Sequence, residues 1–208
     1  MSRPLHPSAI ANPSGPVRGS GLRARWRRAR SLVWAAWFVA GGLTLAHGQV
    51  SREYDLKAVF LYNLASFVDW PPSAFTSPEA PFVIAVVGED PFGRVLDEVV
   101  ANEHVGRHPM VVRRFRRAEE VGGCHVLFIG RSEARRVRDV LRRFRAVPVL
   151  TVGDLPGFVE AGGMVGFATQ ANHLQLYVNR QAINAAALGI SSKLLEVAHV
   201  VDVVAASP

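Results

Sequence analysis

The chain has 208 residues, with 24 Lys+Arg against 17 Asp+Glu and a pI of about 10.6. The charge is unevenly placed, because residues 1–48 hold seven arginines and no acidic residue. Setting those seven aside leaves 17 basic and 17 acidic residues in the rest of the chain, which is therefore neutral. The high pI belongs to the N-terminal segment, and composition gives no support to a nucleic-acid-binding protein.

The N-terminal segment has the order of parts typical of a signal peptide. A basic cluster at residues 23–30 precedes an uncharged, mostly apolar run at 31–46. Ala46 and Gly48 are placed like the −3 and −1 residues of a cleavage site. The run has 16 residues, fewer than the roughly 20 that a membrane-spanning helix needs. We expect residues 1–48 to be a disordered extension plus a cleaved signal peptide, and the mature protein to be periplasmic. An uncleaved N-terminal anchor is the alternative, and it would leave the domain on the same side of the membrane.

The remaining chain is long enough for one domain with a hydrophobic core, which we place at residues 49–204, with a short tail at 205–208. Its one cysteine, Cys124, cannot form an internal disulfide. Cys124 follows Gly123 and precedes an apolar run, a setting that predicts a buried, unreactive thiol.

The first predicted element is a helix over residues 52–70. Its apolar residues recur at spacings of three and four, which predicts one buried stripe made of Leu56, Val59, Phe60, Asn63, Leu64, Phe67 and Val68. Pro71 ends this helix, since proline cannot continue the hydrogen-bond ladder. A continuous apolar run at 82–87, closed by glycine, predicts a strand buried on both faces, and residues 91–101 predict a helix.

Further along, residues 109–115, 125–129 and 147–152 predict strands. Ser132 is a candidate cap for a helix with apolar positions 137, 140, 141 and 144. Residues 164–169 and 174–179 predict a hairpin, and residues 180–188 and 191–201 predict two final helices. Strands alternating with helices indicate an α/β fold with three layers. We expect a mixed, mainly parallel central sheet with helices on both faces, and a C-terminal hairpin followed by helices.

The motifs of common enzymes are missing from this sequence. Residues 88–93 form a glycine-bounded loop between a strand and a helix, but no Lys-Ser/Thr pair follows, and Glu89 and Asp90 would repel a phosphate. We therefore expect a tight turn in which Asp90 caps the next helix. The histidines show no metal-ligand spacing, and no serine stands in a nucleophile elbow. We expect no catalytic residue, no metal and no cofactor.

Two local features leave alternatives open. Residues 113–145 hold eleven arginines and four acids, which is either a solvated surface or a patch for anionic lipid or an acidic partner. Phe67, Trp70 and Pro71 close the first helix, so Trp70 either packs onto the core or is presented to a partner. Together with Tyr177 and Asn179, these three residues are the candidate binding residues.

Several strings taken together resemble the YfiR-like family of periplasmic regulators. They are KAVFLYNLASFVDWP at 57–71, IAVVGEDPFG at 84–93, CHVLFI at 124–129, VLTVGD at 149–154, GMVGF at 163–167, LYVN at 176–179 and ISSKLL at 190–195. They occur in this order over nearly the whole mature chain, and the ordered set is more specific than any one string.

The resemblance implies a non-enzymatic repressor that binds the periplasmic sensor part of a membrane-bound diguanylate cyclase and so lowers cyclic di-GMP and biofilm formation. It also implies a homodimer. Redox control in the family uses disulfides, which the lone Cys124 permits only between two chains. The alternative function is a small-molecule-binding module that feeds a sensor kinase or a transporter, with a deep pocket lined by Trp70, Tyr177 or Asn179. An exported enzyme with an unrecognised site is a third hypothesis.

Overall fold

A computed structural model describes residues 52–171 and 173–201. The predicted signal peptide and the C-terminal tail lie outside these residues. Among the residues described, no helix combines the length and the apolar character needed to cross a membrane.

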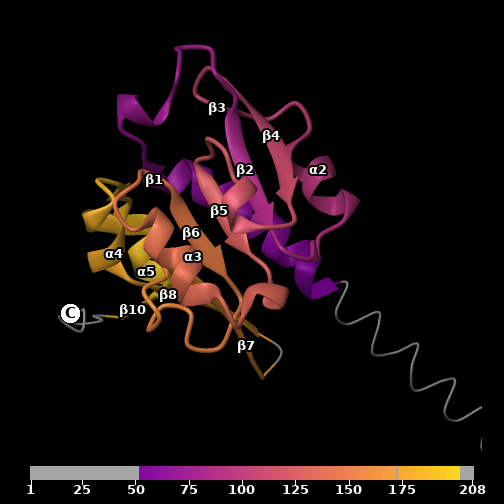
Figure 1. The fold of residues 1–208 in the computed structure, drawn as a ribbon, viewed down its shortest axis with the longest axis vertical. Helices are drawn as coiled ribbons and strands as arrows, with labels where there is room; N and C mark the ends of the chain where they lie inside the picture. Colours follow the sequence, from indigo (N-terminus) through magenta and orange to yellow (C-terminus); the bar gives the residue numbers. More distant parts are fainter. Residues whose placement is uncertain (1–51, 172, 202–208) are drawn as a thin grey trace, which may run out of the picture. The chain divides into compact units, whose positions relative to one another are not determined.

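The centre of the fold is an eight-stranded mixed sheet with the order β10-β8-β7-β6-β5-β2-β4-β3 (Figure 1). Its strands are β2 Phe82–Val87, β3 His104–Val105, β4 His108–Phe115, β5 Val126–Ile129, β6 Leu150–Gly153, β7 Val165–Gln170, β8 His173–Val178 and β10 His199–Val200. The five strands from β4 to β7 are parallel, whereas β8 pairs antiparallel with β7 and β3 pairs antiparallel with β4. The predicted central strands β2, β5 and β6 are neighbours, parallel and fully buried, which confirms that part of the prediction.

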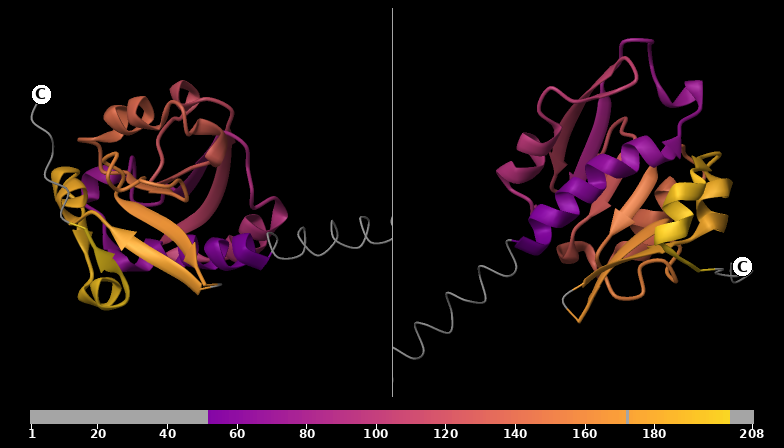
Figure 2. Two further views of the ribbon diagram at one scale, coloured as in Figure 1. Left: turned by 90° about the horizontal axis from the view of Figure 1, so that it is seen from below. Right: turned by 180° about the vertical axis from the view of Figure 1, so that it is seen from behind.

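One face of the sheet is covered by the first helix (residues 52–67) together with α2 (Arg94–Val100), α4 (Arg180–Ala185) and α5 (Ser192–Val197), as Figure 2 shows from behind. We call this the first-helix face. Alternate residues of a strand point to the same face, so Phe82, Ile84 and Val86 of β2 lie in this half of the core.

The opposite face is covered by α3 (Val137–Phe144), and we call it the α3 face (Figure 1). Val140, Leu141 and Phe144 turn inward and pack against the other residues of β2 and β5. Helices on both faces of a mainly parallel sheet confirm the predicted three-layer α/β fold.

The first helix is rotated from the predicted orientation. Its buried residues are Tyr54, Lys57, Ala58, Leu61, Leu64 and Ala65, whereas Leu56 is 46% exposed and Val59 is 42% exposed. The predicted stripe was therefore wrong for these two residues. The alanines let the helix lie close to the sheet, and Lys57 is accepted in the buried stripe because a buried carboxylate, that of Asp154, is its partner.

Some element boundaries also differ from the predictions. The first helix ends at residue 67, and the chain then forms β1 (Val68–Asp69), which pairs with β9 (Gly189–Ile190). The last predicted helix stops at Val197, before β10. Ser132 caps no helix: it lies in a 3-10 turn, and its hydroxyl accepts a hydrogen bond from the Glu89 amide.

The glycine-bounded loop at 88–93 is a tight turn, as predicted, although the N-cap of α2 is Gly93 rather than Asp90. Asp90 instead accepts a hydrogen bond from the Phe92 amide within the turn. The Arg114 guanidinium binds Asp90, Asp97 and the Gly93 carbonyl. The loop is thus tied to β4 by protein groups of its own.

Candidate functional site

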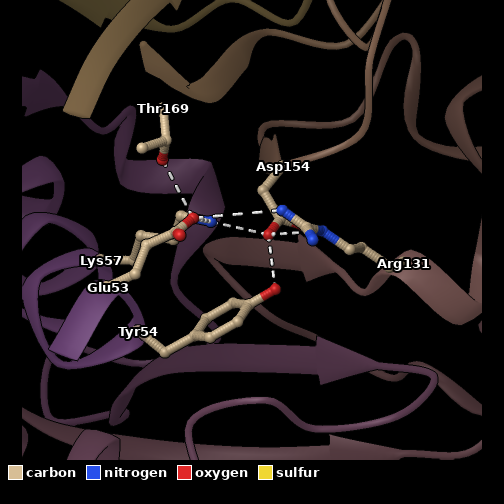
Figure 3. A network of polar contacts seen from close by, with 6 residues as sticks. All are labelled: Glu53, Tyr54, Lys57, Arg131, Asp154 and Thr169. Atoms are coloured by element: carbon tan, nitrogen blue, oxygen red, sulfur yellow. Dashed lines mark hydrogen bonds and ion pairs between the residues drawn. The ribbon is translucent and has the colours of Figure 1, made fainter. Parts of the chain in front are cut away.

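A buried carboxylate connects the first helix to the carboxyl ends of the sheet strands. Asp154 follows β6 directly, and its Oδ2 accepts hydrogen bonds from Tyr54 Oη at 2.7 Å, Lys57 Nζ at 2.8 Å and Arg131 Nε at 3.1 Å. Figure 3 shows these donors converging on one carboxylate from the helix and from the segment after β5. We call Glu53, Tyr54, Lys57, Arg131, Asp154 and Thr169 the Asp154 network.

Lys57 has only 1% of its side chain exposed, so its charge requires close partners. Glu53 lies 2.6 Å from Lys57 Nζ, and the ammonium also lies 4.4 Å from the centre of the Tyr54 ring. Partial burial opposes ionisation of Glu53, but the hydrogen bond and charge of Lys57 outweigh it and lower the pKa of that carboxyl. Burial, followed by the hydrogen bond to Asp154, raises the pKa of Tyr54 far above its ordinary value. At neutral pH the Tyr54 phenol therefore keeps its proton and donates it in the hydrogen bond to Asp154.

The network forms one wall of an open pocket of about 690 Å³. Only two residue pairs join β6 to β7, so the hairpin of β7 and β8 extends past the end of β6 and forms a second wall. The segment after Asp154 forms the rest, with Phe158 buried among glycines. A Cβ on Gly153 or Gly163 would lie 2.6 or 2.2 Å from the Phe158 ring, so neither position accepts a side chain without displacing it. Open α/β sheets commonly bind ligands at this edge, beyond the carboxyl ends of the strands.

Trp70 packs against an aromatic cluster at the other end of the first helix. Its ring meets Phe82 at 5.1 Å and His125 at 5.8 Å, both edge to face, and its indole N–H donates to the Ala65 carbonyl. Phe75 stacks on His108, also near His125. Trp70 thus folds back toward the core while keeping part of its surface exposed.

The five predicted binding residues do not form one site. Phe67 and Trp70 pack on the first-helix face of the core, whereas Tyr177 packs on the α3 face. Asn179 is buried, and its side chain caps α4 through the Ala182 amide and donates to the Val159 carbonyl. Tyr177 lines the pocket beside the Asp154 network, but Trp70 and Asn179 do not.

Cys124 is 6% exposed, and burial raises the pKa of its thiol to about 12. A thiol with such a pKa is almost entirely protonated at neutral pH and is a poor nucleophile. Within residues 52–171 and 173–201, no group of three or more His, Cys, Asp or Glu side chains is placed to hold a metal ion. The Asp154 network is suited to holding the first helix against the ends of β5 and β6 and to binding a ligand in the adjoining pocket.

Sequence reasoning missed the residues at the centre of this site. Lys57 and Asp154 both lie in strings that carry the family resemblance, yet 97 residues separate them and no spacing rule pairs them. The available signal was the place of Lys57 among alanines and apolar residues, in a helix that could bury either of two sides. Arg131 was counted only as one member of the basic region.

The comparisons with known proteins agree with the resemblance. The comparison with curated proteins found no match. A family model described as YfiR/HmsC-like matches residues 54–199, which includes strands β2 to β8 of the central sheet and both Lys57 and Asp154. Because this match covers well over half of the chain, the protein belongs to the YfiR/HmsC-like family.

Proposed function

We propose that this protein is a periplasmic repressor that binds the sensor part of an inner-membrane diguanylate cyclase and holds it inactive. The observation that carries this function is the family match over residues 54–199, since YfiR-like proteins are regulators that act through a protein partner. The exposed side of the first helix supports a protein partner for this chain as well.

The first helix carries apolar side chains on two sides. One side is buried, and the other presents Leu56 and Val59 to solvent one turn apart, beside the half-buried Phe60. A helix that is apolar on both sides normally contacts protein on both. We place the contact with the cyclase on Leu56, Val59 and Phe60, which lie on the helix that the Asp154 network joins to the sheet.

The mechanism is a shift of population. A repressor lowers cyclase activity only if it binds the inactive conformation more tightly than the active one. Moving the cyclase from almost fully active to almost fully inactive needs about a 10⁴-fold difference in affinity between the two states. Burying two or three apolar side chains in one state only can supply much of this difference, at about 1.5–3 kcal/mol each.

The test is co-purification of the full chain with the membrane-bound cyclase encoded nearest to its own gene. Leu56→Glu and Val59→Glu should each lose most of the captured cyclase while melting at an unchanged temperature. Val147→Glu is the matched control, because Val147 is 40% exposed but follows α3 on the opposite face. Equal capture by all three variants would place the contact elsewhere. No capture by the wild type would refute the proposed function.

The pocket favours a second candidate, a small-molecule-binding module. It has about 690 Å³ of space, Tyr177 and Thr169 line it, and Asp154 Oδ1 is buried without a hydrogen-bond partner among the described residues. A ligand that binds the folded state raises the melting temperature in proportion to the logarithm of its concentration. A melting shift that disappears in Tyr177→Ala, without any capture of the cyclase, would favour this function over repression.

A further inference from the structure

The α3 face carries an unusual excess of arginine. Residues 113–145 hold eleven arginines, of which Arg114 pairs with acids beside α2 and Arg131 belongs to the Asp154 network. The remaining nine outnumber the four acids of this stretch by five, and the formal charge of the whole stretch is +7.

Most of these nine arginines have no acidic neighbour. Within residues 52–171 and 173–201, Arg136 pairs with Glu133 and Arg142 pairs with Asp139. Seven have no carboxylate within ion-pair distance among those residues, and all seven side chains are exposed: Arg113, Arg116, Arg117, Arg135, Arg138, Arg143 and Arg145. The rest of the chain contains one acidic residue, Asp202. We call these seven residues the arginine face.

The fold brings the seven to one side of the sheet. The apolar residues of α3 turn inward, which leaves Arg138 and Arg143 on its outer side. Arg113 is two residues from both Val111 and Phe115 of β4, which pack on the α3 side. Its side chain therefore projects toward the same side. Arg143 donates to the Glu119 carbonyl and so joins α3 to the turn that follows β4, where Arg116 and Arg117 lie. Arg135 and Arg145 lie just before and just after α3.

The chemistry of this face differs from that of a protein-binding surface. The core of a protein interface is apolar and aromatic. Among the described residues, the exposed large hydrophobics are Leu56, Val59, Val147, Val197 and Val200, and only Val147 adjoins α3. A surface of unpaired arginines with almost no apolar centre fits a layer of mobile anionic groups better than one shaped partner.

We propose that the arginine face binds the surface of a membrane that contains anionic lipids. Residues 49–208 are neutral overall, so attraction to the membrane comes from the uneven placement of charge and orients the molecule. With the α3 face on the lipid, the first-helix face and its exposed Leu56 and Val59 turn away from the bilayer. The inference rests on the proposed function in one respect only, which is that the protein is located beside a membrane.

The test is co-sedimentation with vesicles of phosphatidylglycerol and phosphatidylcholine, compared with vesicles of phosphatidylcholine alone. The full chain is used after its N-terminus has been determined, with the same N-terminus in every variant, because residues 1–48 are themselves basic. One arginine near an anionic surface contributes about fivefold to binding, so the triple variant Arg113→Gln, Arg138→Gln, Arg145→Gln should bind about 100-fold more weakly.

The matched control removes three exposed arginines from helices of the first-helix face: Arg52→Gln, Arg94→Gln and Arg180→Gln. It has the same net charge as the first triple variant and should keep most of the binding to anionic vesicles. About 1 M salt, which screens charges beyond about 3 Å, should release the wild type.

Equal losses in the two triple variants would overturn the proposal, because binding would then follow net charge and not this face. Equal binding to vesicles of phosphatidylcholine alone would also overturn it. So would the absence of vesicle binding combined with retention on immobilised poly-glutamate that the first triple variant loses, because the arginine face would then serve an acidic protein.

Discussion

The two ends of the first helix are held to the same sheet by different chemistry. At the N-terminal end, Lys57 and Tyr54 bind the buried carboxylate of Asp154. At the C-terminal end, Trp70 packs its ring against Phe82 and His125. A buried ion pair fails almost completely when one partner is removed, whereas an aromatic contact loses stability in proportion to the surface removed. The helix therefore has one end that depends on a buried charge pair and another that tolerates gradual change.

The largest effect is expected at the polar end. Lys57→Met leaves the largely exposed Arg131 as the remaining cation of Asp154 and Glu53, and should lower the free energy of unfolding by about 3–5 kcal/mol, measured by urea denaturation. The double variant Lys57→Met, Asp154→Leu should be more stable than Lys57→Met, because it removes the buried carboxylate that has lost its buried cation. Arg94→Met is the control: it breaks an exposed pair with Glu98 and should cost less than about 1 kcal/mol. A Lys57→Met variant as stable as the wild type would refute the role of the network.

At the aromatic end, Trp70→Ala should lower the free energy of unfolding by about 3 kcal/mol, because the ring contacts the core. Trp70→Phe should retain much of that stability. If Trp70 instead anchors the partner, the alanine variant should keep its stability and lose about 2 kcal/mol or more of binding to the cyclase. Unchanged stability and unchanged repression would exclude both roles.

His125 makes the aromatic end sensitive to acid. Burial lowers the pKa of His125 to about 4, the nearby Ala74 backbone opposes this shift, and the charge of the nearby His108 adds to it. The folded state thus binds fewer protons than the unfolded state between about pH 4 and 6.5. This contribution to stability is complete above about pH 6.5 and should fall by about 2 kcal/mol by pH 5.

The measurement is the free energy of unfolding at several pH values in this window. His125→Gln, which removes the titrating ring, should have a flatter pH profile than the wild type. Identical slopes for the two proteins would show that His125 takes up no proton on unfolding.

The smallest effect is expected at Cys124, which lies at neither end of the helix. Its thiol should react slowly with a thiol reagent in the folded protein and quickly in urea, because burial keeps it protonated and inaccessible. Cys124→Ala should lower the free energy of unfolding by about 1 kcal/mol and leave repression intact. Loss of repression in a folded Cys124→Ala variant would indicate an intermolecular redox contact.

Local patterns predicted the elements that depend on local chemistry. The glycine-closed apolar runs predicted β2, β5 and β6, because two-sided burial leaves no place for polar residues. The rotation of the first helix was not predictable in this way. Counting Leu56 and Val59 as buried ignored the possibility that Lys57 has a partner, and that partner comes from a loop 97 residues away.

The candidate site was likewise predictable only where it depends on local sequence. Tyr177 was predicted as a binding residue and lines the pocket, whereas Asn179 is used to cap α4. The pocket itself depends on how far the hairpin extends past β6, which is set by strand register. The register between parallel strands that are far apart in the chain is difficult to predict from a single sequence. The arginine-rich region was visible in the sequence, but the separation of paired from unpaired arginines required the structure.

The most direct test of the proposed function is the rate of cyclic di-GMP synthesis by the membrane-bound cyclase, reconstituted with and without the purified protein. The protein should lower this rate to a small fraction at saturation, Val147→Glu should act like the wild type, and Leu56→Glu should need a much higher concentration. A rate that stays unchanged at saturating protein, with the cyclase shown to be bound, would contradict repression.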